Sequence, residues 1–265
     1  MPDAREPVER DRQMVTALSR GLELLSSFRA ERPLLSNAEL SKASGVPRST
    51  VSRLTHTLVK LGYLEYDTQH SAYRLGAKVL SLSYALSGGM VLRNMLAPYL
   101  HMLAEESRSQ AAVAACEEYS MLILDVVGHS ETLSQPMLIG SHMTLDTTAM
   151  GRAYLAACSV GERRRIIDHL VKHRNRSSTE LEEIVRQAQA EYGARGYCTS
   201  VNAWREGVNG VAVPLFLRNF GRRILLTCGG SAAQMPESAI HDRIGPLLVK
   251  VAGDLERQST SLTRI

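Results

Sequence analysis

The sequence is poor in cysteine, in aromatic side chains and in metal-binding patterns. Its four cysteines are dispersed among 265 residues; no two of them form a C-x-x-C pair, and none has a histidine at zinc-finger spacing. Buried, reduced thiols are therefore favoured over a zinc site. We expect neither a metal ion nor a cofactor. The four residues are Cys116, Cys158, Cys198 and Cys228.

Long apolar runs are also missing. The longest apolar-rich stretch covers residues 79–92 (VLSLSYALSGGMVL), and it is too short and too interrupted by serine and glycine to span a bilayer. The N-terminal segment MPDAREPVERDRQ is polar and lacks the apolar core of a secretory signal. The sequence therefore predicts a flexible arm over residues 1–13 and a cytoplasmic protein with no membrane partner.

Motifs of the common enzyme classes do not occur. The sequence contains no H-E-x-x-H, G-x-S-x-G, G-x-G-x-x-G, P-loop or S-x-x-K pattern. Cys228 lies beside Gly229 and Gly230, but neither a histidine partner nor a helix N-terminus is indicated for a nucleophile there. No catalytic residue is expected, and an enzyme that acts on a small molecule is the less favoured alternative.

What is present is a composition typical of soluble globular proteins, with 44% hydrophobic and 22% charged residues. The length suits two domains. The net charge of +4 is mild, but residues 41–62 hold four basic side chains and no acidic one. This local excess suits contact with a polyanion such as DNA.

Three helices are predicted near the N-terminus. Apolar residues at positions 15, 18, 22, 25 and 28 form one stripe of an amphipathic helix. Ser36 and Glu39 form a capping box that opens a second helix, and Gly45 ends it. Pro47 fits the first turn of a third helix, with Ser44 as its N-cap.

The third helix has two distinct faces. Its apolar residues recur at intervals of three and four and are expected to point inward together; they are Val51, Leu54, Leu58 and Leu61. The opposite face carries arginine and small hydroxyl residues. Gly62 is expected to stop the helix, and the runs at 63–67 and 72–76 predict a hairpin that forms a wing.

Two helices joined by a short turn with glycine have the spacing of a helix-turn-helix, whose second helix lies in the DNA major groove. Arginine can neutralise phosphates or pair with guanine, while short hydroxyl side chains let the helix backbone approach the groove. A helical hairpin that binds nothing would more often mix glutamate with lysine on its exposed face. The candidate DNA-binding residues are Arg48, Ser49, Thr50, Ser52, Arg53 and His56.

In the remaining sequence, runs of strands bracket helices, which favours an α+β fold with a largely antiparallel sheet. Strands are predicted at 111–116, 121–127, 133–139, 197–200, 208–217 and 222–228. Helices are predicted at 77–86, 91–107, 148–158, 161–172, 179–192 and 236–257. The predicted parts are the arm at 1–13, a winged helix-turn-helix DNA-binding domain at 14–76, a linker helix at 77–89 and a C-terminal domain at 90–265.

Three stretches of the C-terminal domain could converge on a ligand. SHMTLDTTAMGRA opens a helix whose free N–H groups near Thr148 favour an anion such as a carboxylated metabolite. TSVNAWREG is a polar loop with the chain's only tryptophan, and LTCGGSA ends a strand with small residues that permit close approach. Each stretch also has a purely structural interpretation. Thr148 can serve only as an N-cap, Trp204 can pack on the sheet or at a subunit contact, and Gly229 can form a turn with no ligand near it.

Several segments together resemble one known family. RGLELLSSF, LSNAELSKASGVPRSTVSRLTHTLVKLGYLEYD and AYRLGAKVLSL look like the winged helix-turn-helix of the IclR family of bacterial transcriptional regulators. TLDTTAMGRAYLAA, RRIIDHLV, EYGARGYC, EGVNGVAVPLF and RRILLTCGG are similar to its C-terminal domain. The resemblance covers roughly residues 14–258.

The resemblance implies a ligand-responsive repressor or activator, for instance of a catabolic operon. It would be a homodimer or homotetramer that binds palindromic double-stranded operator DNA, with RNA polymerase as a further candidate partner. Residues 90–265 would form a GAF-like domain for effector binding and oligomerisation, and the linker helix would transmit effector binding to the DNA-binding domains. The remaining alternative is a ligand-sensing or assembly module with a degenerate winged domain.

The resemblance also points to effector contacts. Matching positions are Met143, Ala149, Met150, Ser200, Val208, Gly210, Thr227 and Gly229, and the same stretches add Leu145, Thr148 and Asn202 as candidates. Ser200 stands where the family often has an acidic residue, and Gly210 where a cysteine occurs. The pocket is therefore expected to be less anionic and roomier at that corner, and to take an aromatic or otherwise bulky carboxylate.

Overall fold

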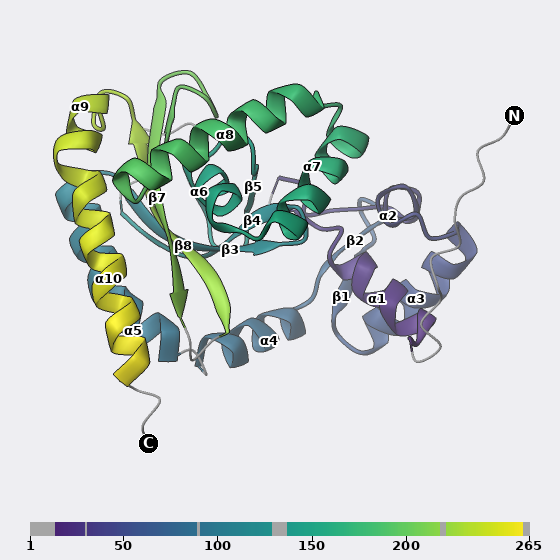
Figure 1. Cartoon of the computed structure of the whole chain (residues 1–265). Helices are drawn as coiled ribbons and strands as arrows, with labels where there is room; N and C mark the ends of the chain where they lie inside the picture. The colour runs from purple at the N-terminus through teal and green to yellow at the C-terminus, as the bar shows by residue number, and fades with distance from the viewer. Residues whose placement is uncertain (1–13, 30, 89–90, 129–136, 218–220, 262–265) are drawn as a thin grey trace, which may run out of the picture. The chain divides into compact units, whose positions relative to one another are not determined.

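A computed structural model describes residues 14–29, 31–88, 91–128, 137–217 and 221–261 of the chain. The chain divides into two compact units, Met1–Met90 and Val91–Ile265 (Figure 1). Each unit has its own apolar core, so each is described by itself.

The first unit is a helix-turn-helix with a wing, as the sequence predicts. Its elements are α1 (Thr16–Leu25), α2 (Asn37–Ser44), α3 (Arg48–Lys60), β1 (Leu64–Asp67), β2 (Ala72–Leu75) and α4 (Ala77–Gly88). The strands β1 and β2 form an antiparallel hairpin. The core packs one side of each of the first three helices against the hairpin, through Leu24, Phe28, Leu35, Leu40, Val46, Val51 and Leu64.

The turn between α2 and α3 forms largely for the predicted reasons. The Ser36 side chain and the Glu39 backbone N–H form the predicted capping box, and the hydrogen bonds from Ser36 hold the pKa of the Glu39 carboxyl below its usual value. Gly45 ends α2 in the left-handed conformation, with φ of 69°. The predicted cap of α3 is wrong. Pro47 is the N-cap residue, because the Ser44 hydroxyl donates to the Leu40 carbonyl within its own helix.

The apolar residues of α1 and α3 do not all point inward as predicted. In α1 the buried residues are Gly21 and Leu24, whereas Leu18 and Leu22 are 62% and 55% exposed. Leu25 and Phe28 of the predicted stripe do join the core. Gly21 and Leu24 pack beside them in place of Leu18 and Leu22. In α3, Leu61 is 49% exposed, while Val51, Leu54 and Leu58 join the core as predicted.

The second unit is built on a six-stranded antiparallel sheet with the strand order β5-β4-β3-β8-β7-β6. Its strands are β3 (Gln110–Glu117), β4 (Ser120–Val127), β5 (His142–Met143), β6 (Cys198–Val201), β7 (Val208–Leu217) and β8 (Arg222–Ser231). Its helices are α5 (Val91–Ser107), α6 (Ala149–Ala157), α7 (Val160–Arg174), α8 (Ser178–Arg195), α9 (Glu237–Ala239) and α10 (Gly245–Ser261).

Helices cover both faces of this sheet (Figure 1). α5 and α10 pack on one face through leucines such as Leu100 and Leu248. α6, α7 and α8 cover the other face, with Leu155, Ile166 and Val185 in that core. The sequence-based prediction of an α+β fold with an antiparallel sheet is confirmed.

Two predicted elements differ in the structure. The closing helix is interrupted after α9 by a π-helical turn, η2 (Ile240–Ile244). Gly245 follows it, where a β-carbon would lie 2.6 Å from the Tyr197 ring, so tight packing against that ring accompanies the irregular turn. The strand predicted at 133–139 falls largely outside the described residues, and Met137 is not in a strand because its backbone pairs with the Gln110 side chain.

Candidate functional site

Five of the six candidate DNA-binding residues lie exposed along α3. These five are Arg48, Ser49, Ser52, Arg53 and His56, and Thr50 is half-buried. Ser52 accepts a hydrogen bond from the Asn37 side chain at 3.2 Å, which ties α3 to the start of α2. Within the described part of the chain, neither Arg48 nor Arg53 forms an ion pair. Both guanidinium groups are therefore available for an anionic partner.

The N-terminus of α3 adds backbone donors to this surface. Its N-cap residue, Pro47, supplies no side-chain hydrogen bond, and the first N–H groups that bond to the Pro47 carbonyl are those of Thr50 and Val51, both at 2.9 Å. The N–H groups of Arg48 and Ser49 precede them at the positive end of the helix. Such groups suit a phosphate oxygen.

The wing is a short hairpin with stabilised strands and turn. Arg74 on β2 forms an ion pair with Glu65 on β1 at 2.9 Å, and the rings of Tyr66 and Tyr73 lie 5.0 Å apart. In the turn, the Asp67 carboxylate accepts a hydrogen bond from the His70 N–H at 3.0 Å. The wing can thus present its exposed tip as a defined loop.

A cavity in the second unit lies where the N-terminus of α6 meets β7 and β8. Its volume is about 40 Å³, which suffices for a few water molecules but is well below the roughly 300–1,000 Å³ of typical ligand pockets. The lining residues are Met137, Met143, Thr148, Ala149, Met150, Ser200, Trp204, Val208, Asn209, Gly210, Thr227, Cys228 and Gly229.

Nine of the eleven candidate effector contacts line this cavity, and two do not. Leu145 is fully buried beneath α6, and its backbone lies so close that a β-carbon on Gly151 would come within 2.3 Å of it. Asn202 has a left-handed backbone with φ of 53°, and its side-chain oxygen accepts from the Gly207 N–H at 2.8 Å. Asn202 therefore shapes the loop that carries Trp204.

Sequence reasoning did not place Met137, Asn209 or Cys228 among the contacts. Met137 follows a segment outside the described residues, so no local pattern marked it. Asn209 and Cys228 adjoin the predicted Gly210 and Gly229 in sequence, but successive residues of a strand normally point to opposite faces, so the prediction of one does not extend to the next. Trp204 was recognised only as part of a polar loop, and the structure puts it in the cavity wall.

The start of α6 combines a helix cap with the cavity wall. The Thr148 hydroxyl accepts from the Gly151 N–H at 3.1 Å and donates to the Thr144 carbonyl at 2.6 Å, so the N-cap interpretation holds. The two intervening N–H groups belong to Ala149 and Met150, whose residues line the cavity. The positive helix end therefore adjoins the cavity.

The rest of the wall is mainly apolar. The Ser200 hydroxyl donates to the Thr147 carbonyl at 2.6 Å, and the Thr227 hydroxyl donates to the Val211 carbonyl at 2.9 Å, so both donors are already used. At the corner beside Gly210, a β-carbon would lie in ordinary contact with the Ala149 methyl group, at 3.5 Å. The cavity suits an apolar ring better than a strongly polar molecule.

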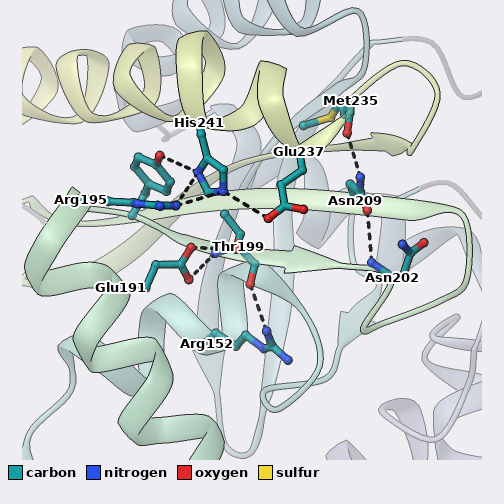
Figure 2. A network of polar contacts seen from close by, with 10 residues as sticks. Arg152, Glu191, Arg195, Thr199, Asn202, Asn209, Met235, Glu237 and His241 are labelled. Carbon is teal, nitrogen blue, oxygen red and sulfur yellow. Dashed lines mark hydrogen bonds and ion pairs between the residues drawn. The ribbon is translucent and has the colours of Figure 1, made fainter.

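A network of polar contacts joins β6, β7 and the loop between them to the neighbouring helices (Figure 2). Asn209 accepts from the Asn202 N–H at 3.2 Å and donates to the Met235 carbonyl at 2.9 Å, so it joins the Trp204 loop to the segment before α9. Thr199 on β6 donates twice to Glu191 on α8, at 3.0 and 2.7 Å. These bonds fix β6 and its loop against the neighbouring helices.

The cysteines show no sign of reactivity. All four are free thiols, and burial raises the pKa of Cys116 to about 11 and those of Cys198 and Cys228 to about 12. A thiol with such a pKa stays protonated near neutral pH and is a poor nucleophile. Among the described residues, no group of three or more potential metal ligands comes together, and no helix is long and apolar enough to cross a membrane.

Comparison with known proteins identifies both units. The IclR helix-turn-helix domain matches residues 17–68, and the domain described as bacterial transcriptional regulator IclR C-terminal matches residues 83–257. The chain is 31% identical to the HTH-type transcriptional regulator TsaQ1/TsaQ2 of Comamonas testosteroni, over 92% of this chain and 88% of the relative.

Solved structures agree with this assignment. An IclR family transcriptional regulator from Brucella abortus superposes with a TM-score of 0.85 at 36% identity, over 96% of both chains. An IclR homolog from Microbacterium hydrocarbonoxydans, solved in complex with 4-hydroxybenzoate, has a TM-score of 0.72 at 20% identity, over 92% of this chain and 99% of that one. The chain belongs to the IclR family of DNA-binding transcriptional regulators, which is a family of regulators and not of enzymes.

Proposed function

We propose that the chain binds a palindromic operator through α3 and the wing, and that a small aromatic carboxylate in the cavity of the second unit changes that binding. Residues 14–76 would bind DNA, 90–265 would bind the effector and mediate assembly, and 77–89 would connect the two, all in the cytoplasm. The observation that carries the proposal is the exposed, acid-free face of α3 in a chain that also encloses an apolar cavity beside a helix N-terminus.

On α3, the proposed roles follow from side-chain chemistry. Arg53 lies exposed in the middle of the helix and can pair with guanine in the major groove. Arg48 and the N–H groups at the helix start suit a phosphate. Ser49 and Ser52 have short side chains, so the backbone of α3 can come close to the base edges in the major groove.

Palindromic DNA requires two copies of α3 related by twofold symmetry. The exposed leucines of the first unit supply an apolar face for a second copy, because Leu18, Leu22 and Leu61 line a groove of about 1180 Å³ beside α3. Apolar side chains this exposed are costly in water. The groove is also lined by Ser52, Arg53 and His56 on its α3 side. We propose that a second copy of the chain packs only on the α1 side of the groove, over Leu18 and Leu22, and thereby pairs the two reading helices while their DNA-binding residues stay exposed.

An aromatic carboxylate matches both the polar and the apolar part of the cavity wall. Its carboxylate would accept from the N–H groups of Ala149 and Met150 at the start of α6, and its ring would lie against Met143 and Trp204. The homologue solved with 4-hydroxybenzoate supports this class of effector. Because the cavity volume of about 40 Å³ is too small for an aromatic ring, the wall must rearrange to admit one.

Two measurements test the proposal together. A thermal-shift screen of benzoate, 4-hydroxybenzoate and related carboxylates identifies binders, since a ligand that binds only the folded state raises the unfolding temperature. Each binder is then tested for its effect on affinity for DNA upstream of the chain's own coding region. Binding of a carboxylate without any DNA affinity would favour a sensor with a degenerate winged domain. If a bound effector leaves the DNA affinity unchanged, the effector would act instead through contacts of the protein with RNA polymerase.

A further inference from the structure

Gln110 and Met137 form a two-point contact at the edge of the cavity. The Gln110 amide nitrogen donates to the Met137 carbonyl at 3.2 Å, and its amide oxygen accepts from the Met137 N–H at 2.8 Å. Gln110 lies on β3 and is only 4% exposed. A buried side chain with both amide atoms satisfied holds one orientation, so the Met137 backbone has a fixed position relative to the sheet.

The Met137 side chain extends from this fixed point into the cavity. Gly229 on β8 pairs directly with Gln110, and a β-carbon on Gly229 would meet the Met137 terminal methyl group at 3.6 Å. The methionine therefore lies over the bare backbone of Gly229, where other residues would place a side chain. Met137 is 6% exposed and lines the cavity.

The size of the cavity indicates what this arrangement does. A volume of about 40 Å³ is too small for an aromatic ring, although the surrounding residues have the composition of a ligand site. Methionine has three rotatable bonds and a polarizable thioether, so it fills irregular space and adopts other rotamers at low cost. Rotation of this one side chain away from Gly229 would therefore enlarge the cavity.

We propose that Met137 is the size-determining residue of the effector site: its side chain occupies the space of the effector's distal ring substituent and must rotate away when the effector binds, while Gln110 keeps its backbone in place. This inference rests on the proposed function of the cavity. The length of the residue at position 137 then sets which aromatic carboxylates the protein accepts.

Trp204 provides a direct readout, because it lines the cavity and is the chain's only tryptophan. Three probes that absorb at shorter wavelengths than tryptophan can be titrated against its fluorescence: benzoate, the bulkier para-tert-butylbenzoate, and toluene, which has a ring without a carboxylate. The full chain is compared with Met137→Ala and Met137→Val. Met102→Ala is the matched control, since Met102 packs on the opposite face of the sheet.

Met137→Ala is expected to raise the affinity for para-tert-butylbenzoate relative to benzoate by about tenfold or more, since each methylene of fit is worth at least that in an apolar pocket. Met137→Val should fall between Met137→Ala and the unaltered chain, and it keeps the test valid if the alanine variant folds poorly. Met102→Ala should leave the ratio unchanged.

An unchanged ratio in both Met137 variants would overturn the inference, while DNA binding and benzoate binding would still stand. If neither carboxylate binds any variant, the proposed effector class is wrong, and toluene decides the role of Met137. Tighter toluene binding by Met137→Ala than by the unaltered chain supports the inference, as an enlarged apolar cavity takes up small neutral rings. Equal or absent toluene binding in all variants overturns it.

Discussion

Neighbouring residues of α3 differ sharply in burial: within one helical turn, some pack in the core and others are exposed to solvent. Val51 and Thr55 are fully buried, whereas Ser52 and Arg53 are exposed. Thr55 tolerates burial because its hydroxyl donates to the Val51 carbonyl at 3.0 Å, so no polar group is left without a partner. Substitution of an exposed residue on this helix therefore reports on DNA binding with little effect on folding.

Arg53→Ala is predicted to weaken operator binding by about 1 to 3 kcal/mol, roughly fivefold to 150-fold, through the loss of a base contact. Unfolding of the variant should match that of the unaltered chain. Arg164→Ala is the matched control, because it removes one exposed arginine from α7 in the other unit. Gel-shift titration at fixed salt measures the difference, and equal affinities of both variants would exclude Arg53 as a reading residue.

Gly151 is predicted to be irreplaceable in α6. A β-carbon would approach the Leu145 backbone within 2.3 Å, so Gly151→Ala should lower the free energy of unfolding by at least about 1 to 3 kcal/mol. Gly193 lies in α8 with nothing within 4 Å of its β-carbon position, and Gly193→Ala should stabilise the protein by about 0.5 to 1 kcal/mol. Urea denaturation tests both, and a neutral Gly151→Ala would contradict the close packing of α6.

At the scale of helices and strands, the features that can be predicted from the sequence are those that depend on interactions between residues close together in the chain. The Ser36 capping box, the left-handed Gly45 and the strand β7 follow from short-range patterns and agree with the structure. The buried side of α1 does not follow from them, since either of two stripes could face the core and only tertiary packing selects between them. The π-helical turn before α10 is followed by Gly245, which packs tightly on the Tyr197 ring, a residue distant in sequence.

The cavity was predictable in part for the same reason. Thr148 and Gly229 lie in stretches whose helix start or small residues permit a ligand, whereas Gly210 was identified only through the family resemblance. Met137 has no such local signal, because its position depends on hydrogen bonds to Gln110, which lies far away along the chain.

The capping box of α2 predicts a pH dependence of stability. Hydrogen bonds from Ser36 lower the pKa of Glu39 in the folded state below its usual value of 4.5. This contribution is therefore present at neutral pH and is lost as the pH falls below 4.5 and through the folded-state pKa. Glu39→Gln should flatten the loss of unfolding free energy in this acidic range. Glu180→Gln, at the start of α8, is the comparison; an identical acid dependence in Glu39→Gln and the unaltered chain would contradict the prediction.

At the scale of the whole molecule, the proposed function requires two copies of the chain on one operator. Replacing both Leu18 and Leu22 with glutamate places charges on the exposed apolar face of α1. This variant should lose affinity for a palindromic operator by about tenfold or more, while binding to an isolated half-site changes little. Sedimentation analysis and gel shifts measure the two effects. Val160→Glu, at a 77% exposed position on α7, should change neither, and an unaffected double variant would place the contact between copies elsewhere.

Control of DNA binding in one unit by occupation of the cavity in the other is the core of the proposed function. Its most direct test is the Kd of the full chain for its own upstream DNA, measured with and without a saturating aromatic carboxylate that binds the cavity by Trp204 fluorescence. We predict a change of about fivefold to 150-fold, the usual range of coupling between two sites. The same Kd with and without the bound carboxylate would contradict it.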